Sequence, residues 1–508
     1  MIASPSLPTH LFLYQHLDHA ARNWPDRPAL RDGRQALTYA MLHARAMQAT
    51  QRLTDAGTVP GDRVILLLAN TVDFAIAYWG AVCAGAVVTP ISPETPVEKL
   101  GWILADCTPK VIIADPGLDD HAVLALPHDS TATVLTPSEL TVETALSAAP
   151  CAGRLIDQDL GCMIYTSGST GTPKGVMLSH QNLTTASRSV CTYLGYRGDD
   201  RIFVTIPLTF DYGMHQLTMA ALVGAEVIVE RSFGNALFTL DRMVKAGATV
   251  FPIVPTMVPL ISPLADRFDL GGIRLVSSTA AALHPGMIDR VAEIFPKATI
   301  FSMYGLTECH RCTYLPPDQL QRRKGSVGIA IPNTELWVEL ADGTRATRDA
   351  TGELVIRGAT VMKGYWNNLE KTAQRLRPGR FPGEMVLYTG DLCRLDAEGY
   401  LYFLARSDDV LKIRGEKVAP KEVEEALQSH PAVSEAVVFG RPDAVQGQMV
   451  CAVVTFEHGR SADIAELKAW CATRLEPVAV PHRIDLRDSL ARNQNGKIDR
   501  AALLQDLV

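Results

Sequence analysis

Long apolar runs and an excess of basic residues are both missing from this sequence, and their absence removes several classes of protein. No window reaches the roughly 18 consecutive apolar residues of a membrane-spanning helix, so we expect no membrane span. Residues 1–30 lack a basic start that leads into an apolar core, so we also expect no signal peptide. The net charge of -7 argues against nucleic acid as a partner, because phosphate binding favours a basic face.

Cysteines are few and scattered. The chain has ten of them, and a scattered set fits a reducing compartment, so we expect a cytoplasmic protein. Cys309 and Cys312 have CxxC spacing, but a zinc site would want a second pair or suitably placed histidines, and none is evident. We therefore interpret them as cysteines near a pocket or in the core.

What is present is the composition of a multidomain globular chain. The 508 residues are 47% hydrophobic and 20% charged, which is enough apolar material for a sizeable core. Up to about residue 400, apolar runs alternate with helical periodicity, which predicts parallel sheets covered by helices on both faces. The predicted strands are 63–70, 86–92, 109–115, 201–208, 225–230, 248–255, 273–279 and 298–305, and the predicted helices between them include 71–86 and 214–225.

The pattern changes twice further along the chain. From about residue 335 it becomes β-rich, with the turn signals ADGT, DATG and DAEG between strands. A second change after Arg406 predicts two domains, 1–406 and 407–508. The second is expected to be a small α+β unit with helices at 421–428 and 462–474 and strands at 433–439, 449–456 and 482–486.

The stretch YTSGSTGTPKGVMLSH, residues 165–180, is a polar ribbon between apolar runs. Gly168, Gly171 and Gly175 allow backbone conformations in which amide groups converge on one point. Lys174 adds a positive charge, and hydroxyl groups come from Thr166, Ser167, Ser169, Thr170 and Thr172. The spacing differs from GxxxxGK[ST]. Composition alone therefore leaves two interpretations, a phosphate-binding loop of another kind and a flexible surface loop.

The order of these residues closely resembles the phosphate-binding signature of the adenylate-forming superfamily. That group includes acyl-CoA synthetases, luciferases and the adenylation domains of non-ribosomal peptide synthetases. Further segments resemble the family's motifs in the family's order: MYGLTE (303–308), GELVIRG (352–358), GYW (364–366), residues 388–427 and NQNGKIDR (493–500). The resemblance covers nearly the whole chain. It implies an ATP-dependent ligase that makes an acyl-adenylate and pyrophosphate, then passes the acyl group to a thiol with release of AMP.

The resemblance also implies roles for single residues at the nucleotide. Thr307 should face the α-phosphate, and Glu308 should bind Mg²⁺. Tyr304, followed by Gly305, should stack on adenine, and Asp391 should accept hydrogen bonds from the ribose. Arg406 should reach the ribose or the phosphates. The β- and γ-phosphates should be held by the loop of Thr166, Ser167, Gly168, Ser169, Thr170, Gly171 and Lys174.

Two residues of the smaller domain complete the implied site. Within NQNGKIDR, Lys497 corresponds to the family's catalytic lysine, which contacts the substrate carboxylate and the α-phosphate and offsets charge there. Asp408 resembles the hinge residue about which the small domain swings. Taken alone, Lys497 would be an ordinary solvated lysine after a turn.

The segment that resembles the family's acid pocket, 206–225, contains Phe210 followed by Asp211. This pair resembles amino-acid adenylation domains, in which the aspartate binds the α-ammonium of the substrate, and a buried carboxylate needs such a partner. Asp211 could instead cap the helix that follows or interact with its dipole. His215 lies one helical turn away and is either a pocket or a packing residue. Met303 and Cys312 are further candidates for the pocket wall.

We therefore expect an enzyme that activates a small amino acid such as proline and loads it on the phosphopantetheine of a separate carrier protein. The alternative is a fatty or aryl acyl-CoA synthetase, since coenzyme A presents the same thiol. A non-catalytic relative is a third alternative, which the retention of Lys497, Glu308 and Asp391 argues against.

Overall fold

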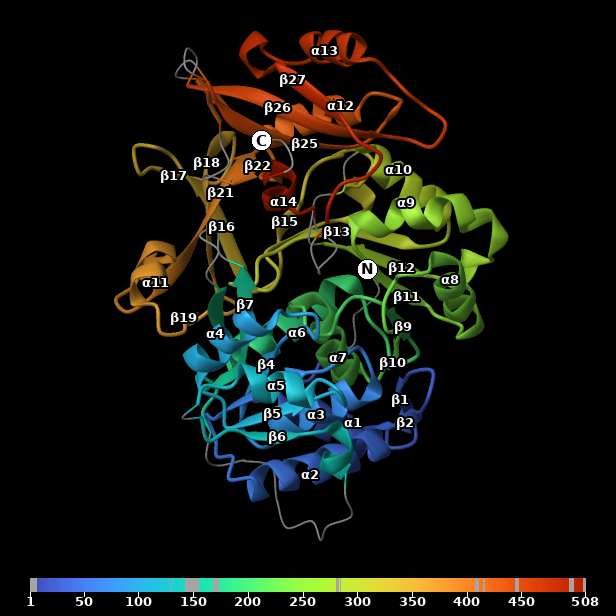
Figure 1. Ribbon diagram of the computed structural model, residues 1–508, viewed down its shortest axis with the longest axis vertical. Helices are drawn as coiled ribbons and strands as arrows, with labels where there is room; N and C mark the ends of the chain where they lie inside the picture. Colours follow the sequence, from blue (N-terminus) through green and yellow to red (C-terminus); the bar gives the residue numbers. More distant parts are fainter. Residues whose placement is uncertain are drawn as a thin grey trace.

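The computed structural model describes residues 7–128, 130–141, 155–167, 173–279, 283, 285–406, 411–413, 416–443, 447–492 and 498–505. They form a large N-terminal α/β domain, a β-rich part beside it and a small C-terminal domain (Figure 1). This confirms the predicted fold class. One difference is that both large sheets are mixed, with antiparallel strands added to a parallel centre. Within the described ranges, every helix is too short or too polar to span a bilayer.

The first large sheet has nine strands, of which six consecutive strands run parallel to one another. Antiparallel strands close both edges. In spatial order the strands are β15 (Ile329–Ala330), β14 (Thr313–Leu315), β13 (Thr299–Tyr304), β12 (Leu275–Ser278), β11 (Val250–Ile253), β9 (Arg201–Val204), β10 (Glu226–Val229), β1 (Pro28–Arg31) and β2 (Ala36–Thr38).

The second large sheet has seven strands. They are β19 (Gly364–Tyr365), β8 (Pro173–Ser179), β7 (Leu160–Ser167), β4 (Val87–Pro90), β3 (Arg63–Leu67), β5 (Val111–Ala114) and β6 (Thr133–Leu135). The pair β7–β8 is antiparallel. Parallel pairing would need a crossover of about a dozen residues or more, and the connection from Ser167 to Pro173 is too short for that.

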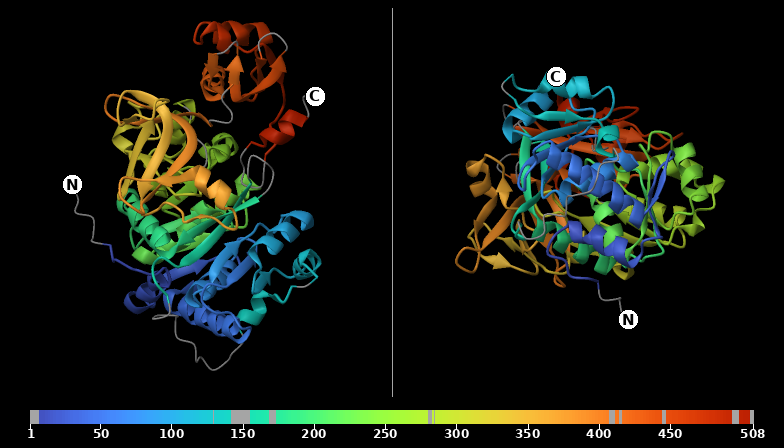
Figure 2. Two further views of the ribbon diagram at one scale, coloured as in Figure 1. Left: turned by 90° about the vertical axis from the view of Figure 1, so that its left-hand side faces the viewer. Right: turned by 90° about the horizontal axis from the view of Figure 1, so that it is seen from below.

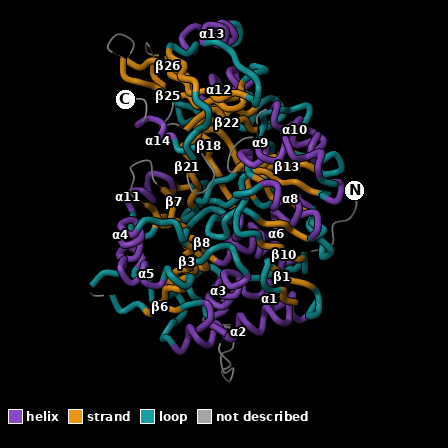
Figure 3. The backbone as a smooth tube through the Cα atoms, turned by 45° about the vertical axis from the view of Figure 1, so that its right-hand side comes forward, coloured by secondary structure: helices purple, strands orange, loops and turns teal. Residues whose placement is uncertain are grey.

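Helices fill the space between the two large sheets and cover their outer faces, as the tube in Figure 3 shows. The N-terminal helices are α1 (Tyr14–Asn23), α2 (Tyr39–Asp55), α3 (Val72–Cys83), α4 (Val97–Cys107), α5 (Asp119–Ala125), α6 (His180–Leu194), α7 (Asp211–Val223), α8 (Ala236–Lys245), α9 (Val258–Ile261), α10 (Pro285–Ile294) and α11 (Leu369–Arg375). Every residue of α7 is buried, including the polar side chains of Asp211, His215, Gln216 and Thr218. It packs against α1 and α6.

Helix α7 begins at Asp211, three residues before the predicted start at 214. The residue at its N-cap is Phe210, whose backbone is extended and whose side chain makes no capping hydrogen bond. A Ser, Thr, Asp or Asn cap is the usual signal of a helix start, and phenylalanine is not one of them, so this boundary has no local sign in the sequence. The earlier start places Asp211 inside the first helical turn.

The β-rich part is a third sheet of six strands. Its strands are β17 (Arg345–Ala346), β16 (Thr334–Glu339), β18 (Ala350–Gly358), β21 (Met385–Leu395), β20 (Leu376–Pro378) and β22 (Leu401–Arg406), with β22 paired to β21. All pairings in it are antiparallel, as the turn signals predicted.

The C-terminal domain stands at the top of the molecule in Figure 1 and in the left view of Figure 2. It has a core of its own, in which Val423 and Leu427 pack with Val438, Val450 and other apolar residues. Its elements are β23 (Leu411–Ile413), β24 (Glu416–Val418), α12 (Pro420–Gln428), β25 (Val433–Asp443), β26 (Gly447–Phe456), α13 (Ile464–Ala472), β27 (Arg483–Leu486) and α14 (Arg500–Gln505).

Candidate active site

The polar ribbon is the tip of the β7–β8 hairpin. Thr166 pairs with Lys174 and Ser167 with Pro173 in the antiparallel register, so the two ends of the ribbon are held side by side. The tip itself, with Gly168, Ser169, Thr170 and Gly171, lies outside the described residues. What the structure fixes is therefore the stem of the predicted phosphate loop.

Tyr365 connects that stem to Glu308. The Lys174 ammonium lies 5.6 Å from the centre of the Tyr365 ring. The Tyr365 hydroxyl donates a hydrogen bond of 2.8 Å to Oε1 of Glu308. Burial and the nearby Glu308 raise the pKa of Tyr365, so its hydroxyl stays protonated and remains a donor. The predicted phosphate-binding lysine and the predicted metal ligand are thus brought together by a residue whose role the sequence did not reveal.

Glu308 belongs to a turn that joins β13 to β14, residues 305–312, which we call the 305–312 turn. Two backbone hydrogen bonds hold it: Cys312 N–H to the Tyr304 carbonyl at 2.9 Å, and Met362 N–H to the Glu308 carbonyl at 2.8 Å. A Cβ atom on Gly305 would lie 2.2 Å from the His310 carbonyl oxygen, so the turn closes only with glycine there. Thr307 is half-buried in the same turn.

The residues predicted for adenine and ribose meet around Asp391. Asp391 and Arg406 are paired across β21 and β22, and Arg406 Nε lies 2.9 Å from Asp391 Oδ1. The direction of that contact does not satisfy hydrogen-bond geometry, so the attraction is electrostatic. The Tyr304 hydroxyl donates a short hydrogen bond to Oδ2. Burial raises the pKa of Asp391, and the charge of Arg406 offsets part of that effect.

Asp211 faces a cation of the chain itself. Its side chain and that of Arg311 are each only 4% exposed, and Arg311 Nη1 lies 3.7 Å from Asp211 Oδ2. The other oxygen, Oδ1, has no hydrogen-bond partner among the described residues. Arg311 was not predicted, because the two residues are a hundred positions apart and share no local pattern. The one available signal was the rule that a buried carboxylate needs a partner.

Two histidines stack beside this ion pair. The rings of His215 and His310 are 5.2 Å apart at an angle of 30°, and His215 Nε2 lies 3.2 Å from Ser187 Oγ on α6. Burial lowers the pKa of His310 to about 4, and burial with the neighbouring His310 and Arg311 lowers the pKa of His215 well below its usual range. Both imidazoles are therefore neutral at pH 7. His215 is buried and lies close enough to Arg311 for that charge to act on it, so it shares the surroundings of the Asp211–Arg311 pair.

Met303 and Cys312 line the same region from β13 and the 305–312 turn. Met303 is buried and its Sδ accepts a hydrogen bond of 2.9 Å from the Tyr193 hydroxyl. Cys312 Sγ lies 3.0 Å from Cys309 Sγ, and both thiols are free and buried. Among the residues that the structure describes, no three metal-ligating side chains come together. The burial of both thiols agrees with cysteines in the core.

The 305–312 turn with Tyr304 links all of these groups. Tyr304 reaches Asp391, Glu308 reaches Tyr365, and Arg311 reaches Asp211. The charges of Glu308 and Asp391 also act on each other, since Glu308 contributes to the raised pKa of Asp391. Two predicted residues, Lys497 and Asp408, lie outside the described residues.

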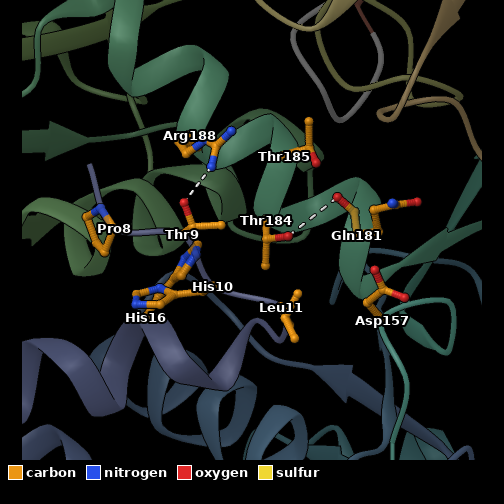
Figure 4. A pocket seen from close by; sticks show the side chains of 10 residues that line it. All are labelled: Pro8, Thr9, His10, Leu11, His16, Asp157, Gln181, Thr184, Thr185 and Arg188. Carbon is orange, nitrogen blue, oxygen red and sulfur yellow. Dashed lines mark hydrogen bonds between the residues drawn. The ribbon is translucent and has the colours of Figure 1, made fainter. Parts of the chain in front are cut away.

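A separate cavity of about 170 Å³ lies between the start of the chain and α6 (Figure 4). The Arg188 guanidinium donates a hydrogen bond of 2.8 Å to Thr9 Oγ1 at its edge. Its lining residues are Pro8, Thr9, His10, Leu11, His16, Asp157, Gln181, Thr184, Thr185 and Arg188. None of the described residues predicted for the site is among them, so this cavity is distinct from the candidate active site.

Comparison with known families gives the class of enzyme. Residues 17–366 match the model of a family described as AMP-binding enzyme, and residues 422–497 match the model described as AMP-binding enzyme C-terminal domain. The chain therefore belongs to the AMP-binding enzyme family. This confirms the resemblance to the adenylate-forming superfamily.

Individual relatives sharpen the assignment. A long-chain-fatty-acid–CoA ligase of Bacillus subtilis (strain 168) is 30% identical over 96% of this chain and 93% of its own length. Tyrocidine synthase 1 of Brevibacillus parabrevis is 28% identical over 97% of this chain, which spans 44% of that longer protein. The ATP-bound structure of MatB from Rhodopseudomonas palustris superposes with a TM-score of 0.87 at 28% identity, covering 97% of this chain and 98% of that one. The chain is an ATP-dependent, AMP-forming ligase that joins an acid to a thiol.

Proposed function

We propose that the acid is a small amino acid, such as proline, and that the acceptor is the phosphopantetheine thiol of a separate carrier protein. The observation that carries this proposal is Asp211, a buried carboxylate at the start of α7 whose Oδ1 has no hydrogen-bond partner among the described residues. A buried acceptor without a donor costs free energy, and a ligand that supplies the donor recovers it. The ammonium group of an amino acid is such a donor.

The reaction has two halves. A carboxylate oxygen of the acid attacks the α-phosphorus of ATP, pyrophosphate leaves, and an acyl-adenylate remains. The thiol sulfur then attacks the acyl carbon, and AMP leaves in place of the poor leaving group that the free acid would offer. The protein contributes orientation and offsets charge on the phosphates.

The residue roles proposed for the first half agree with the contacts of the site. The β7–β8 stem with Lys174 is proposed to hold the phosphates, and Thr307 faces the α-phosphate. Asp391, held by Tyr304 and Arg406, is proposed to accept the ribose hydroxyls. Tyr304 is proposed to stack on adenine with Gly305 beside it, while its hydroxyl stays on Asp391.

Magnesium fits this arrangement. The ion keeps octahedral oxygen ligands and is usually held by one or two carboxylates together with substrate phosphates. Glu308 offers one carboxylate, oriented by Tyr365, and the described residues hold no group of three ligands that would form an all-protein cage. When bound, the ion would offset negative charge on the phosphates.

We further propose that residues 407–508 move as a unit about Asp408 and bring Lys497 to the reacting carboxylate. The separate core of this domain supports independent movement. Replacing Lys497 with Ala should abolish adenylation and spare thiol transfer from a preformed acyl-adenylate, measured as AMP release. Equal losses in both half-reactions would contradict this role.

A cytoplasmic location is also proposed, since every cysteine that the structure describes is a free thiol.

The alternative is an acyl-CoA synthetase for a fatty or aryl acid. One observation favours it: Arg311 already offsets the charge of Asp211, so the acid need not bring a cation. The similarity to the Bacillus subtilis fatty-acid ligase over nearly its full length agrees with this alternative.

Pyrophosphate release across amino acids, fatty acids and aryl acids separates the two. We expect turnover with an α-amino acid, little with its N-acetyl form, and a fall in kcat/KM of about 100-fold in Asp211→Asn, as when a buried charge partner is removed. The matched control is Asp200→Asn, since Asp200 is another buried aspartate paired with an arginine, Arg274. Turnover only with acids that lack an amine would overturn the proposal. Offering coenzyme A and a phosphopantetheinylated carrier protein in parallel identifies the acceptor.

A further inference from the structure

We propose that Arg311 is a positioning residue for the acid, which holds Asp211 through Oδ2 and leaves Oδ1 for the ammonium of the substrate. This inference rests on the proposed amino-acid specificity. Arg311 does not itself contact the reacting atoms. It acts through Asp211 and through the backbone of the 305–312 turn.

Three contacts fix the guanidinium in place. Nη1 donates a hydrogen bond of 2.7 Å to the carbonyl oxygen of His310, and the same nitrogen lies 3.7 Å from Asp211 Oδ2. The guanidinium carbon Cζ lies over the ring of Tyr212, 4.7 Å from the ring centre. Tyr212 is itself anchored, because its hydroxyl donates to the Ser277 carbonyl at 2.8 Å. An arginine held on three sides has little freedom to leave Asp211.

The contact with His310 has a second consequence. His310 has a φ of 58°, in the left-handed region that residues other than glycine rarely adopt. The hydrogen bond from Arg311 to the His310 carbonyl supports this conformation. The arginine therefore supports the part of the 305–312 turn around His310, whereas Glu308 lies in the middle of the turn and is held by Tyr365 and Met362.

The ion pair also explains how Asp211 can be buried before any acid binds. A buried carboxylate without a partner is strongly unfavourable, and a nearby cation offsets it. Because no hydrogen bond from the described residues reaches Oδ1, that oxygen keeps its capacity as an acceptor. An acid that lacks an amine leaves Oδ1 unpaired in the closed site, and such unpaired polar groups are how binding sites reject the wrong substrate.

The test compares Arg311→Met, which keeps bulk and removes charge, with Arg311→Lys, which keeps charge. In pyrophosphate release with the preferred amino acid, we expect Arg311→Met to raise KM for the acid by at least about tenfold while KM for ATP changes by less than about twofold. Arg311→Lys should recover most of the acid affinity. In the Asp211→Asn background, Arg311→Met should add less than about threefold, because the two act as one unit.

The matched control is Arg274→Met, which breaks a buried arginine–aspartate pair with Asp200 outside the site. It should leave both KM values unchanged even if the melting temperature falls. Unchanged KM for the acid in Arg311→Met would overturn the positioning role while the amino-acid specificity stands. Equal increases in both KM values, or activity restored in the double variant, would show a purely structural pair and overturn it as well. If the wild-type enzyme accepts only acids without an amine, the specificity fails first and the positioning role fails with it.

Discussion

Two buried aspartates face arginines at opposite ends of the candidate active site, and the two pairs are built differently. Asp391 is 1% exposed while its partner Arg406 is 45% exposed, and their closest atoms are 2.9 Å apart. Asp211 and Arg311 are 4% exposed each, at 3.7 Å. Tyr304 donates a hydrogen bond to Oδ2 of Asp391, whereas Oδ2 of Asp211 has the longer ion-pair contact with Arg311. In both aspartates Oδ1 has no hydrogen-bond partner among the described residues.

The difference suits two kinds of substrate. The Asp391 pair is proposed to meet the ribose, which is the same in every turnover. Its carboxylate is buried and held by Tyr304, while its partner Arg406 is partly exposed to solvent. The Asp211 pair is proposed to meet the acid, which must be selected. A sealed pair with one unused acceptor discriminates more strongly, because a wrong acid cannot replace the missing donor with water.

Asp391→Asn should give the largest effect. It should show that the proposed nucleotide site around Asp391 and the proposed acid site around Asp211 act independently. It removes the charge that Tyr304 and Arg406 both contact, so we expect kcat/KM for ATP to fall by at least about 100-fold. KM for the acid should change by less than about threefold. Pyrophosphate release with each substrate varied in turn measures both. Asp396→Asn, at a turn that pairs with Arg323, is the control, and equal losses for ATP and acid would contradict the separation.

Gly305→Ala should affect the nucleotide site and the acid site together, because the 305–312 turn carries residues of both, Glu308 and Arg311. The new Cβ would lie 2.2 Å from the His310 carbonyl oxygen, and the forced shift costs about 1–3 kcal/mol. We expect KM to rise for both ATP and the acid, by about 30-fold each at the middle of that range. Gly272→Ala is the control, because its Cβ would meet the nearest atom at an ordinary 3.7 Å. An effect on one substrate alone would show that the two ends do not share the turn.

Acid pH should act with opposite sign on two buried groups, His16 and Asp391. Burial lowers the pKa of His16, which adjoins α7, from 6.5 to about 3, so the folded state binds fewer protons than the unfolded state below pH 6.5. His16 alone should then lower stability by about 1.4 kcal/mol per pH unit as the pH drops from about 6.5 towards 5, and His215 and His310 add to this fall. Burial raises the pKa of Asp391, so its contribution opposes this and favours the folded state as pH falls.

Urea unfolding across this pH range tests the signs. His16→Gln should flatten the pH dependence, and Asp391→Asn should steepen it. A variant of an exposed histidine, His458→Gln, serves as the control. A His16→Gln profile with the wild-type slope would contradict a buried neutral imidazole.

Arg406→Gln should give the smallest effect. Its side chain is half in solvent, and exposed ion pairs contribute about 0–1 kcal/mol. We expect KM for ATP to rise by about fivefold at most, well below the effect of Arg311→Met on the acid. KM for ATP in Arg406→Gln and KM for the acid in Arg311→Met should be measured under the same conditions. A larger change in Arg406→Gln would contradict the view that the Asp211–Arg311 pair discriminates more strongly.

Much of the fold was predictable because local patterns encode it. The apolar run at 63–70 became β3, the run at 433–439 became the first part of β25, and the helix predicted at 421–428 differs by one residue from α12. The sheets were predicted as parallel, and the antiparallel β7–β8 and β13–β14 pairs were missed. Their direction follows from the length of a connection rather than from the strands themselves.

At the site, residues carried by motifs could be nominated from the sequence, and residues joined only through space could not. Glu308, Asp391 and Arg406 stand in short recognisable segments, and the structure brings each to a buried contact. Arg311 and Tyr365 gain their importance from partners 100 and 57 positions away. No periodicity or spacing signals such a contact, so only the folded chain reveals it.

The 305–312 turn imposes a constraint on how this enzyme acquires a new substrate. On the proposed roles, exchanges at His310 disturb a backbone that also carries Glu308, so variants there should change the use of ATP together with acid preference. Helix α7 offers a freer route, because its side chains project from a rigid buried scaffold. Engineering for other acids should therefore begin with His215 and its neighbours on α7 and leave the turn unchanged.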